Sequence, residues 1–482
     1  MRKLVVVAPA LAALAFIGCK ASSSGSGSAS GSGSAAVGSG SAAADPWATA
    51  AVPKPPETPE TRQARAEAAV GRVMSIEPEV AKLRQLAFVH EVPAHYQGAA
   101  DFQTFVHREI AKDLPAARSR DLSAAFAHLG LFDKPVDLAA IEEQAMVTQA
   151  GAYYDPSSKQ FFLVAVPDSE LMLDTISAHE LTHALQDQHF DLVKYLPDYG
   201  RIDEDASTAR RFVVEGDATL VMLLYAVRST LGDHIPPAVL MTIRHQIETF
   251  ANQGIAELTA QARSQAAMIG GLGGDIQKAL DAMDDIPPAV LVPLLDAYMK
   301  GALVALTAYE QGGWAAVDDL FRNPPESTEQ VLHPATKLVP VRDHPHQVAL
   351  PRLADPEFAG GVLGELQWRI YFALWKVPDG DEAAAGWGGD RYSVTRRKDG
   401  RLIGRIATIW DTEADARQFE IAYRASLAAR FPGADTGHPD AGVARPDGGK
   451  VFVRAVGTRV VIVDGADEVS DIVTLARTAG RN

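Results

Sequence analysis

The chain has 482 residues, with 45 Lys or Arg against 61 Asp or Glu, so its formal net charge at pH 7 is −16. A surface this acidic argues against binding to nucleic acid and against electrostatic adhesion to anionic lipid, because both ligands repel it. Hydrophobic residues make up 47% of the chain, enough for a large core, and at roughly 100–200 residues per domain the length predicts two or three domains.

The N-terminus has the layout of a signal peptide. Arg2 and Lys3 supply positive charge, and the apolar run over residues 4–17 is too short to span a bilayer. The run ends in Phe16-Ile17-Gly18-Cys19, which resembles a bacterial lipobox, and Cys19 is the only cysteine of the chain. We predict a signal peptide over residues 1–18 and a diacylglycerol on Cys19, the alternative being a free cysteine in an uncleaved signal.

This lipid would be the membrane contact, because loss of Arg2 and Lys3 with the signal changes the formal charge from −16 to −18. We therefore expect an exported protein, lipid-anchored at the bacterial cell envelope. Lys20 after the cysteine is compatible with sorting to the outer membrane.

Residues 19–61 form the predicted tether. The first part is almost entirely Gly, Ser and Ala, and the part over 45–59 is rich in Pro. Such a composition buries too little apolar surface to fold, and it gives a flexible coil followed by a stiffer spacer. From residue 62 onward, charged and apolar positions alternate at helical spacing, which predicts amphipathic helices over 64–74, 80–89, 102–114 and 122–129. We expect them to form a helical layer behind the site.

The next elements carry the chemistry. Apolar segments over 151–154 and 161–166 flank a turn and predict a hairpin, and the following stretch contains no Pro or Gly from 169 to 188 and predicts a helix. On that helix His179 and His183 are four residues apart and share a face, so both can bind one zinc ion. Glu180 lies on the neighbouring side, where a carboxylate can take a proton from a metal-bound water.

A catalytic zinc needs a third protein ligand and an open position for water. Glu215 lies in an apolar stretch over 212–225, where a carboxylate is costly unless it is paired or bound to metal. His189, six residues after His183, has the spacing of the metzincin pattern, but Gln186 replaces the glycine at which that pattern turns. We favour Glu215 and keep His189 as the alternative metal ligand.

These motifs resemble a known class of enzymes. HExxH followed on a later helix by Glu215-Gly216-Asp217-Ala218 resembles the gluzincins, the thermolysin and aminopeptidase N class of zinc peptidases. More narrowly, several phrases are similar to those of a group of bacterial exported HExxH lipoproteins, namely residues 151–156, 179–190, 215–219, 327–334, 386–392 and 410–412.

The resemblance implies a zincin-like catalytic domain in which His179, His183 and Glu215 bind Zn²⁺ and Glu180 is the general base. It also implies that an extended peptide adds to the edge strand before the metal helix. Thermolysin-type enzymes carry an Asp four residues after the ligand Glu to orient a histidine, and here that position is Thr219. Asp217 or Asp205 is the candidate for that role.

A zinc peptidase also needs a donor that stabilises the oxyanion, usually His or Tyr. The candidates are His333 and Tyr298, the second within Tyr298-Met299-Lys300-Gly301, which is similar to a Tyr-x-x-Gly phrase of the gluzincins. The alternative is structural, with His333 fixing a loop and Tyr298 packing.

The last part of the chain, from residue 349 to 482, has a different pattern. Strands over 392–397 and 402–410, a helix over 412–430, strands over 451–455 and 459–463 and a helix over 467–478 predict a small ββαββα domain. We expect it to close the cleft, to recognise substrate or to dock a partner.

The sequence therefore predicts an α+β, mainly helical protein, with a helical layer and zincin-like domain over 62–348 and a C-terminal α+β domain over 349–482. We expect zinc-dependent hydrolysis of peptide bonds, as an endopeptidase acting on peptide or protein substrates. The alternative is a non-catalytic binding or assembly lipoprotein, in which His189 joins Glu215 to close a structural zinc site.

Overall fold

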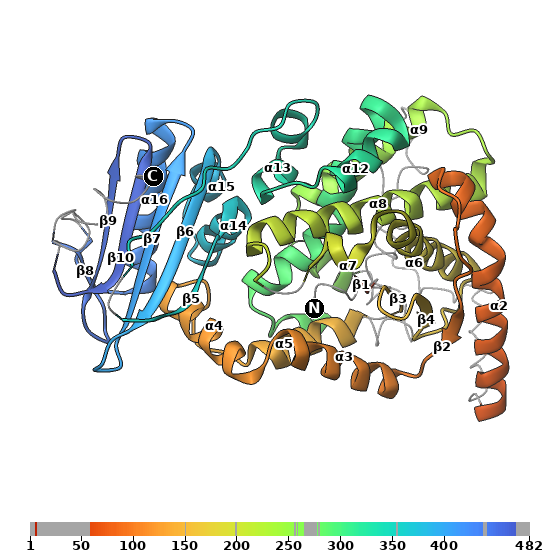
Figure 1. The fold of residues 1–482 in the computed structure, drawn as a ribbon, viewed down its shortest axis with the longest axis horizontal. Coiled ribbons are helices and arrows are strands. Elements are labelled where there is room, and N and C mark those ends of the chain that lie inside the picture. The colour runs from red at the N-terminus through yellow and green to blue at the C-terminus, as the bar shows by residue number, and fades with distance from the viewer. Residues whose placement is uncertain are drawn as a thin grey trace, which may run out of the picture.

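The computed structural model describes residues 5–6, 58–149, 151–197, 200–254, 257, 259–264, 277, 280–352, 355–436 and 441–468. The predicted lipidation site Cys19, most of the predicted tether and all but the first two residues of the predicted last helix lie outside these residues. The described part is α+β and mostly helical, as expected, with a six-stranded antiparallel sheet. Figure 1 shows this sheet at one end of the molecule and the long helices in the rest of it.

The N-terminal helical layer begins earlier than predicted. Helix α2 starts at Pro59, where the Thr58 hydroxyl accepts a hydrogen bond from the backbone N–H of Thr61 and caps the helix. It then continues through Pro78 and ends at Arg84, so the two helices expected over 64–74 and 80–89 are one, which stops five residues earlier than predicted. The layer consists of α2 (Pro59–Arg84), α3 (Ala99–Asp113), α4 (Ala116–Leu129) and α5 (Leu138–Gln149).

A small sheet precedes the long helix α6 (Glu170–Phe190). The predicted hairpin is present as β3 (Ala152–Asp155) and β4 (Gln160–Leu163). β2 (Ala94–Tyr96) adds to β4 in parallel, and β1 (Val5–Val6) pairs antiparallel with β3, so the strand order is β1-β3-β4-β2. The outer edge of β3 therefore takes up an extended segment.

Long helices form the middle of the molecule. Ser169 caps α6 and Asp203 caps α8, each by accepting a hydrogen bond from a backbone N–H three residues on. The helices and short turns of this part are α6 (Glu170–Phe190), α7 (Leu192–Tyr195), α8 (Glu204–Leu231), α9 (Pro237–Asn252), α12 (Pro288–Arg322), α13 (Thr328–Leu332) and the π-helical turn η2 (Pro334–Leu338).

Helices α8 and α12 approach each other at two glycines. A Cβ atom on Gly216 would lie 2.1 Å from the backbone of Gly301, and one on Gly301 would lie 2.3 Å from the carbonyl oxygen of Phe212. Only residues without a side chain permit this backbone contact. α12 is long and apolar enough to cross a membrane by length and composition, but half of its most apolar window is buried inside the protein. We interpret it as a core helix.

The C-terminal part forms one sheet with the order β5-β6-β7-β10-β9-β8. Its two long hairpins and intervening helix match the predicted ββαββ order, while the short edge strands β5 and β8 were not predicted. The elements are β5 (Glu357–Gly361), α14 (Gly364–Leu374), α15 (Gly380–Ala384), β6 (Trp387–Arg396), β7 (Leu402–Trp410), α16 (Glu413–Arg430), β8 (Val443–Ala444), β9 (Lys450–Val456) and β10 (Arg459–Ala466).

Candidate metal centre

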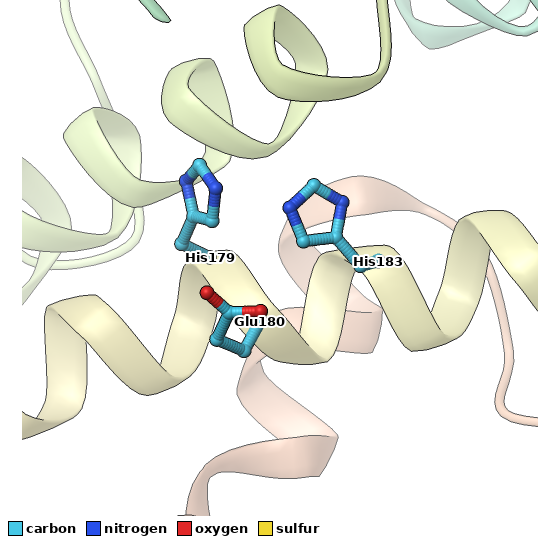
Figure 2. Close-up of side chains that lie close together, drawn as sticks. All are labelled: His179, Glu180 and His183. Atoms are coloured by element: carbon cyan, nitrogen blue, oxygen red, sulfur yellow. The ribbon is translucent and has the colours of Figure 1, made fainter. Parts of the chain in front are cut away.

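His179 and His183 project from the same face of α6, as their spacing predicts (Figure 2). Both side chains are fully buried, and their rings lie 4.7 Å apart between centroids and nearly perpendicular, at 82°. The Glu180 carboxylate leaves the helix in another direction. The helix therefore presents two imidazoles together and keeps the carboxylate beside them.

Glu215 on α8 completes a group of three. Its Oε2 lies 3.4 Å from Nε2 of His179 and 3.7 Å from Nε2 of His183. None of these three buried atoms has a hydrogen-bond partner within the part of the chain that the structure describes. Zinc bonds of about 2.0–2.2 Å in tetrahedral geometry separate neighbouring ligand atoms by about 3.4 Å. The three atoms thus fit the ligand spacing of one zinc ion.

Burial fixes the protonation of the two histidines. It lowers the pKa of His179 to about 3 and, reinforced by His179, the pKa of His183 to about 4, although Glu215 acts in the opposite direction on His183. Both rings are therefore neutral at pH 7 and keep a lone pair for a cation. Burial also raises the pKa of Glu215, with His183 and Arg211 opposing it. A divalent cation at this point would favour the ionised carboxylate.

Glu180 is held by the small sheet. Its Oε2 accepts a hydrogen bond of 2.9 Å from the backbone N–H of Tyr154 on β3. His179, Glu180 and His183 also each bring one nitrogen or carboxylate oxygen to within 4.8 Å of the others. The carboxylate therefore lies beside the two imidazoles and next to β3. Because Glu215 reaches both imidazole nitrogens and Glu180 is tied to Tyr154, Glu215 is the better placed of the two carboxylates to complete the group.

His189 lies away from this group. It is exposed in the last turn of α6, and its Nε2 hydrogen bonds to the carbonyl oxygen of Ala87 at 2.8 Å. The structure therefore does not bring the alternative ligand together with His179 and His183. The cause is helical geometry, since a residue six positions after His183 points to another side of an unbroken helix.

The two oxyanion candidates differ in position. The Tyr298 ring lies 5.8 Å from the His179 ring, and burial, followed by the charges of Glu215 and Glu180, raises the pKa of Tyr298 well above its usual value. The phenol therefore stays protonated and can donate. The close approach at Gly301 places it there, because Tyr298 lies one turn earlier on the same helix.

His333 instead joins two helices outside the metal group. Its Nε2 lies 3.0 Å from the Glu365 carboxylate on α14 and 3.4 Å from Arg369. The structure thus does not place His333 with the metal group, and these contacts correspond to the structural alternative.

Asp205 and Asp217, the two candidates for orienting a histidine, lie in different surroundings. Asp205 accepts a hydrogen bond from the backbone N–H of Thr328 at 3.0 Å and so secures α13. Asp217 lies behind the site but reaches His183 only through Gln186, which was not predicted as a site residue. The sequence did contain a signal for Gln186. It lies three residues after His183 on the same helix, and residues at this spacing are neighbours on the helix surface.

A second group of carboxylates, Glu329, Asp343 and Asp411, is close enough to hold a metal. The Lys337 ammonium, however, lies 3.1, 2.6 and 2.7 Å from these three carboxylates, respectively. It supplies the positive charge of this group, which links η2 to the end of β7. We interpret it as a connection between the two parts of the chain.

A cavity of about 210 Å³ lies between the helical layer, α8 and the C-terminal sheet. Arg211, one turn before the predicted ligand on α8, contributes to its wall. The C-terminal part contributes Leu366, Gln367 and Tyr392. The C-terminal part therefore shares the wall of this cavity with the helical layer and α8.

Comparison with known proteins adds one match. A family model described as a domain of unknown function (DUF8575) matches residues 352–475. No curated protein and no solved structure matches the chain. The match agrees in extent with the C-terminal sheet and leaves the metal centre outside it.

Proposed function

We propose that this protein is a gluzincin-like zinc peptidase, in which His179, His183 and Glu215 hold the metal. The observation that carries the proposal is the meeting of three buried ligand atoms that lack hydrogen-bond partners at zinc spacing. Leaving buried polar atoms unsatisfied costs about 1–3 kcal/mol each, so such a cluster in a folded protein needs an explanation. A bound cation supplies one.

Zinc, when bound, would polarise the peptide carbonyl and lower the pKa of a water molecule. Glu180 would take the proton of the attacking water and pass it to the leaving amine. The backbone N–H of Tyr154 holds this carboxylate in place. The protonated phenol of Tyr298 would donate a hydrogen bond to the oxyanion, and we prefer it to His333, which bonds to Glu365 instead.

The outer edge of β3 supports a peptide as substrate. β1 pairs with this edge antiparallel, with Val5 opposite Tyr154 and Val6 opposite Tyr153. Tyr154 also contacts Glu180, so a chain paired with β3 would run beside the catalytic carboxylate. Main-chain pairing of this kind binds an extended peptide regardless of its sequence. This favours an endopeptidase.

The competing structural zinc site needs a fourth protein ligand. Its candidate was His189, which instead bonds to Ala87. Three ligands without His189, with Glu180 beside them, favour a catalytic over a structural zinc site. As further parts of the proposal, the enzyme is exported, is anchored through a lipid on Cys19 and uses its C-terminal domain to shape the cleft.

The experiment compares the purified protein with a Glu180→Gln variant on a mixed peptide library read by mass spectrometry. We expect cleavage by the first and a loss of about 10²–10⁴-fold in the second, with one equivalent of zinc in both. Glu79→Gln, which changes an exposed carboxylate on α2, serves as the control and should cleave normally. Equal cleavage by Glu180→Gln, or no zinc bound by either protein, would contradict the proposal.

A further inference from the structure

A chain of buried hydrogen bonds runs from His183 to the end of α2. The Nδ1 atom of His183 lies 2.8 Å from Oε1 of Gln186, and Nε2 of Gln186 donates to Oδ2 of Asp217 at 3.0 Å. Asp217 accepts a further hydrogen bond of 2.8 Å from Arg84. All four side chains are completely buried. The chain thus connects a candidate metal ligand with a charge on another helix.

The partners of Gln186 decide which way its amide points. Its Nε2 also lies 3.0 Å from the carbonyl oxygen of Val214, an atom that can only accept a hydrogen bond. The end of the amide that faces Val214 must therefore be the NH₂ group. It follows that the oxygen of Gln186 faces His183.

This orientation fixes the tautomer of His183. An amide oxygen only accepts, so Nδ1 of His183 must carry the hydrogen. The other ring nitrogen, Nε2, then keeps its lone pair and faces Glu215 at 3.7 Å. This is the tautomer that can bind a metal through Nε2.

Arg84 holds the far end of the chain. Besides Asp217, it bonds to Asp318 on α12 at 2.7 Å, and its guanidinium lies 4.7 Å from the centre of the Trp314 ring. Asp217 is therefore fixed by an ion pair and can orient the amide. The network joins α2, α6, α8 and α12 behind the metal centre.

We propose that Gln186 is a positioning residue that sets the tautomer and ring orientation of His183 for metal binding. The proposal rests on the zinc site described above. It also explains the residue type, because an amide accepts from His183 at one end and donates to Asp217 at the other. A Glu at position 186 would place a carboxylate oxygen against Asp217, with no hydrogen atom to form the hydrogen bond that Gln186 donates.

The first test needs no substitution. The full-length protein, labelled with ¹⁵N in histidine only and stripped of metal, is studied by NMR near pH 7.5, with the His183 signals assigned from a His183→Asn variant. We expect a single tautomer with hydrogen on Nδ1. A ring with hydrogen on Nε2, or an equal mixture, would overturn the proposal.

The second test compares Gln186→Met with Gln188→Met. Gln188 is a matched control because it lies on the same helix and also makes three hydrogen bonds, all to the backbone of Val89 and His90. We expect Gln186→Met to mix the tautomers and to lower zinc affinity, measured by chelator competition, by about 10–100-fold. Gln188→Met should change neither.

The outcomes separate this proposal from the proposed function. A protein that binds no zinc but shows the Nδ1–H tautomer would contradict the function and leave the orientation of Gln186 standing. If the protein cleaves peptides but Gln186→Met keeps the zinc affinity of the unchanged protein, the proposed function stands and the positioning role of Gln186 is contradicted.

Discussion

Two buried carboxylates, one in each part of the molecule, show how differently such a group can be used. Glu215 in the metal centre and Asp390 in the C-terminal domain are both 2% exposed. Asp390 accepts four hydrogen bonds, from the backbone N–H groups of Leu363 and Gly364 and from the indoles of Trp368 and Trp387. Oε2 of Glu215 accepts none from the residues that the structure describes, and it lies near two imidazoles.

We interpret the difference as that between a structural carboxylate and one proposed to bind a metal. The four donors of Asp390 offset the cost of burying it and tie the start of α14 to β6. Among the described residues none donates a hydrogen bond to Oε2 of Glu215, and in our proposal a cation would offset the cost of burying it. Removing each carboxylate should therefore affect different quantities.

The largest effect is expected for Glu215→Gln. Loss of the third ligand should lower zinc affinity by at least about 100-fold, measured by chelator competition. The metal-free variant should unfold with an unchanged free energy, or with one about 1 kcal/mol higher, because a buried carboxylate has been neutralised. Unchanged zinc affinity would show that another residue closes the site.

Asp390→Asn should show the opposite pattern. Replacing one acceptor oxygen by an NH₂ group leaves buried N–H donors without a partner, which should lower the free energy of unfolding by about 3 kcal/mol. Zinc affinity should remain that of the unchanged protein. Chemical denaturation and zinc titration of the same sample check both statements. A variant of full stability would mean that the four hydrogen bonds contribute little.

The smallest effect concerns a buried histidine that is not a ligand. Burial lowers the pKa of His128, opposed by Asp464, and its Nε2 hydrogen bonds to the Asp464 backbone at 3.2 Å. Because the unfolded state binds the proton more readily, this residue lowers stability as the pH falls below about 6.5.

Denaturation of metal-free protein between pH 8 and pH 5 tests this effect. His128→Asn should lose less stability on acidification than the unchanged chain, by at most about 1.4 kcal/mol per pH unit. The slopes from His179 and His183 are common to both proteins and cancel in the comparison. Parallel curves would contradict the assignment.

Much of the metal helix could be predicted from the sequence, because the relevant relations are local. An uninterrupted helical stretch places His179 and His183 on one face whatever surrounds it. The hairpin before the helix and the ββαββ order after residue 387 follow from turn residues and alternating patterns in the same way. Local geometry also explains why His189 leaves the site.

The tertiary structure decided what joins the two histidines. Glu215 reaches them because α8 packs against α6, and the contact of α8 with α12 at Gly216 and Gly301 sets Tyr298 rather than His333 beside the ring of His179. Gln186, Asp217 and Arg84 came together only through the packing of three helices. Periodicity shows which face of each helix is buried, but the partner of that face depends on how distant helices cross, and no local pattern encodes this crossing.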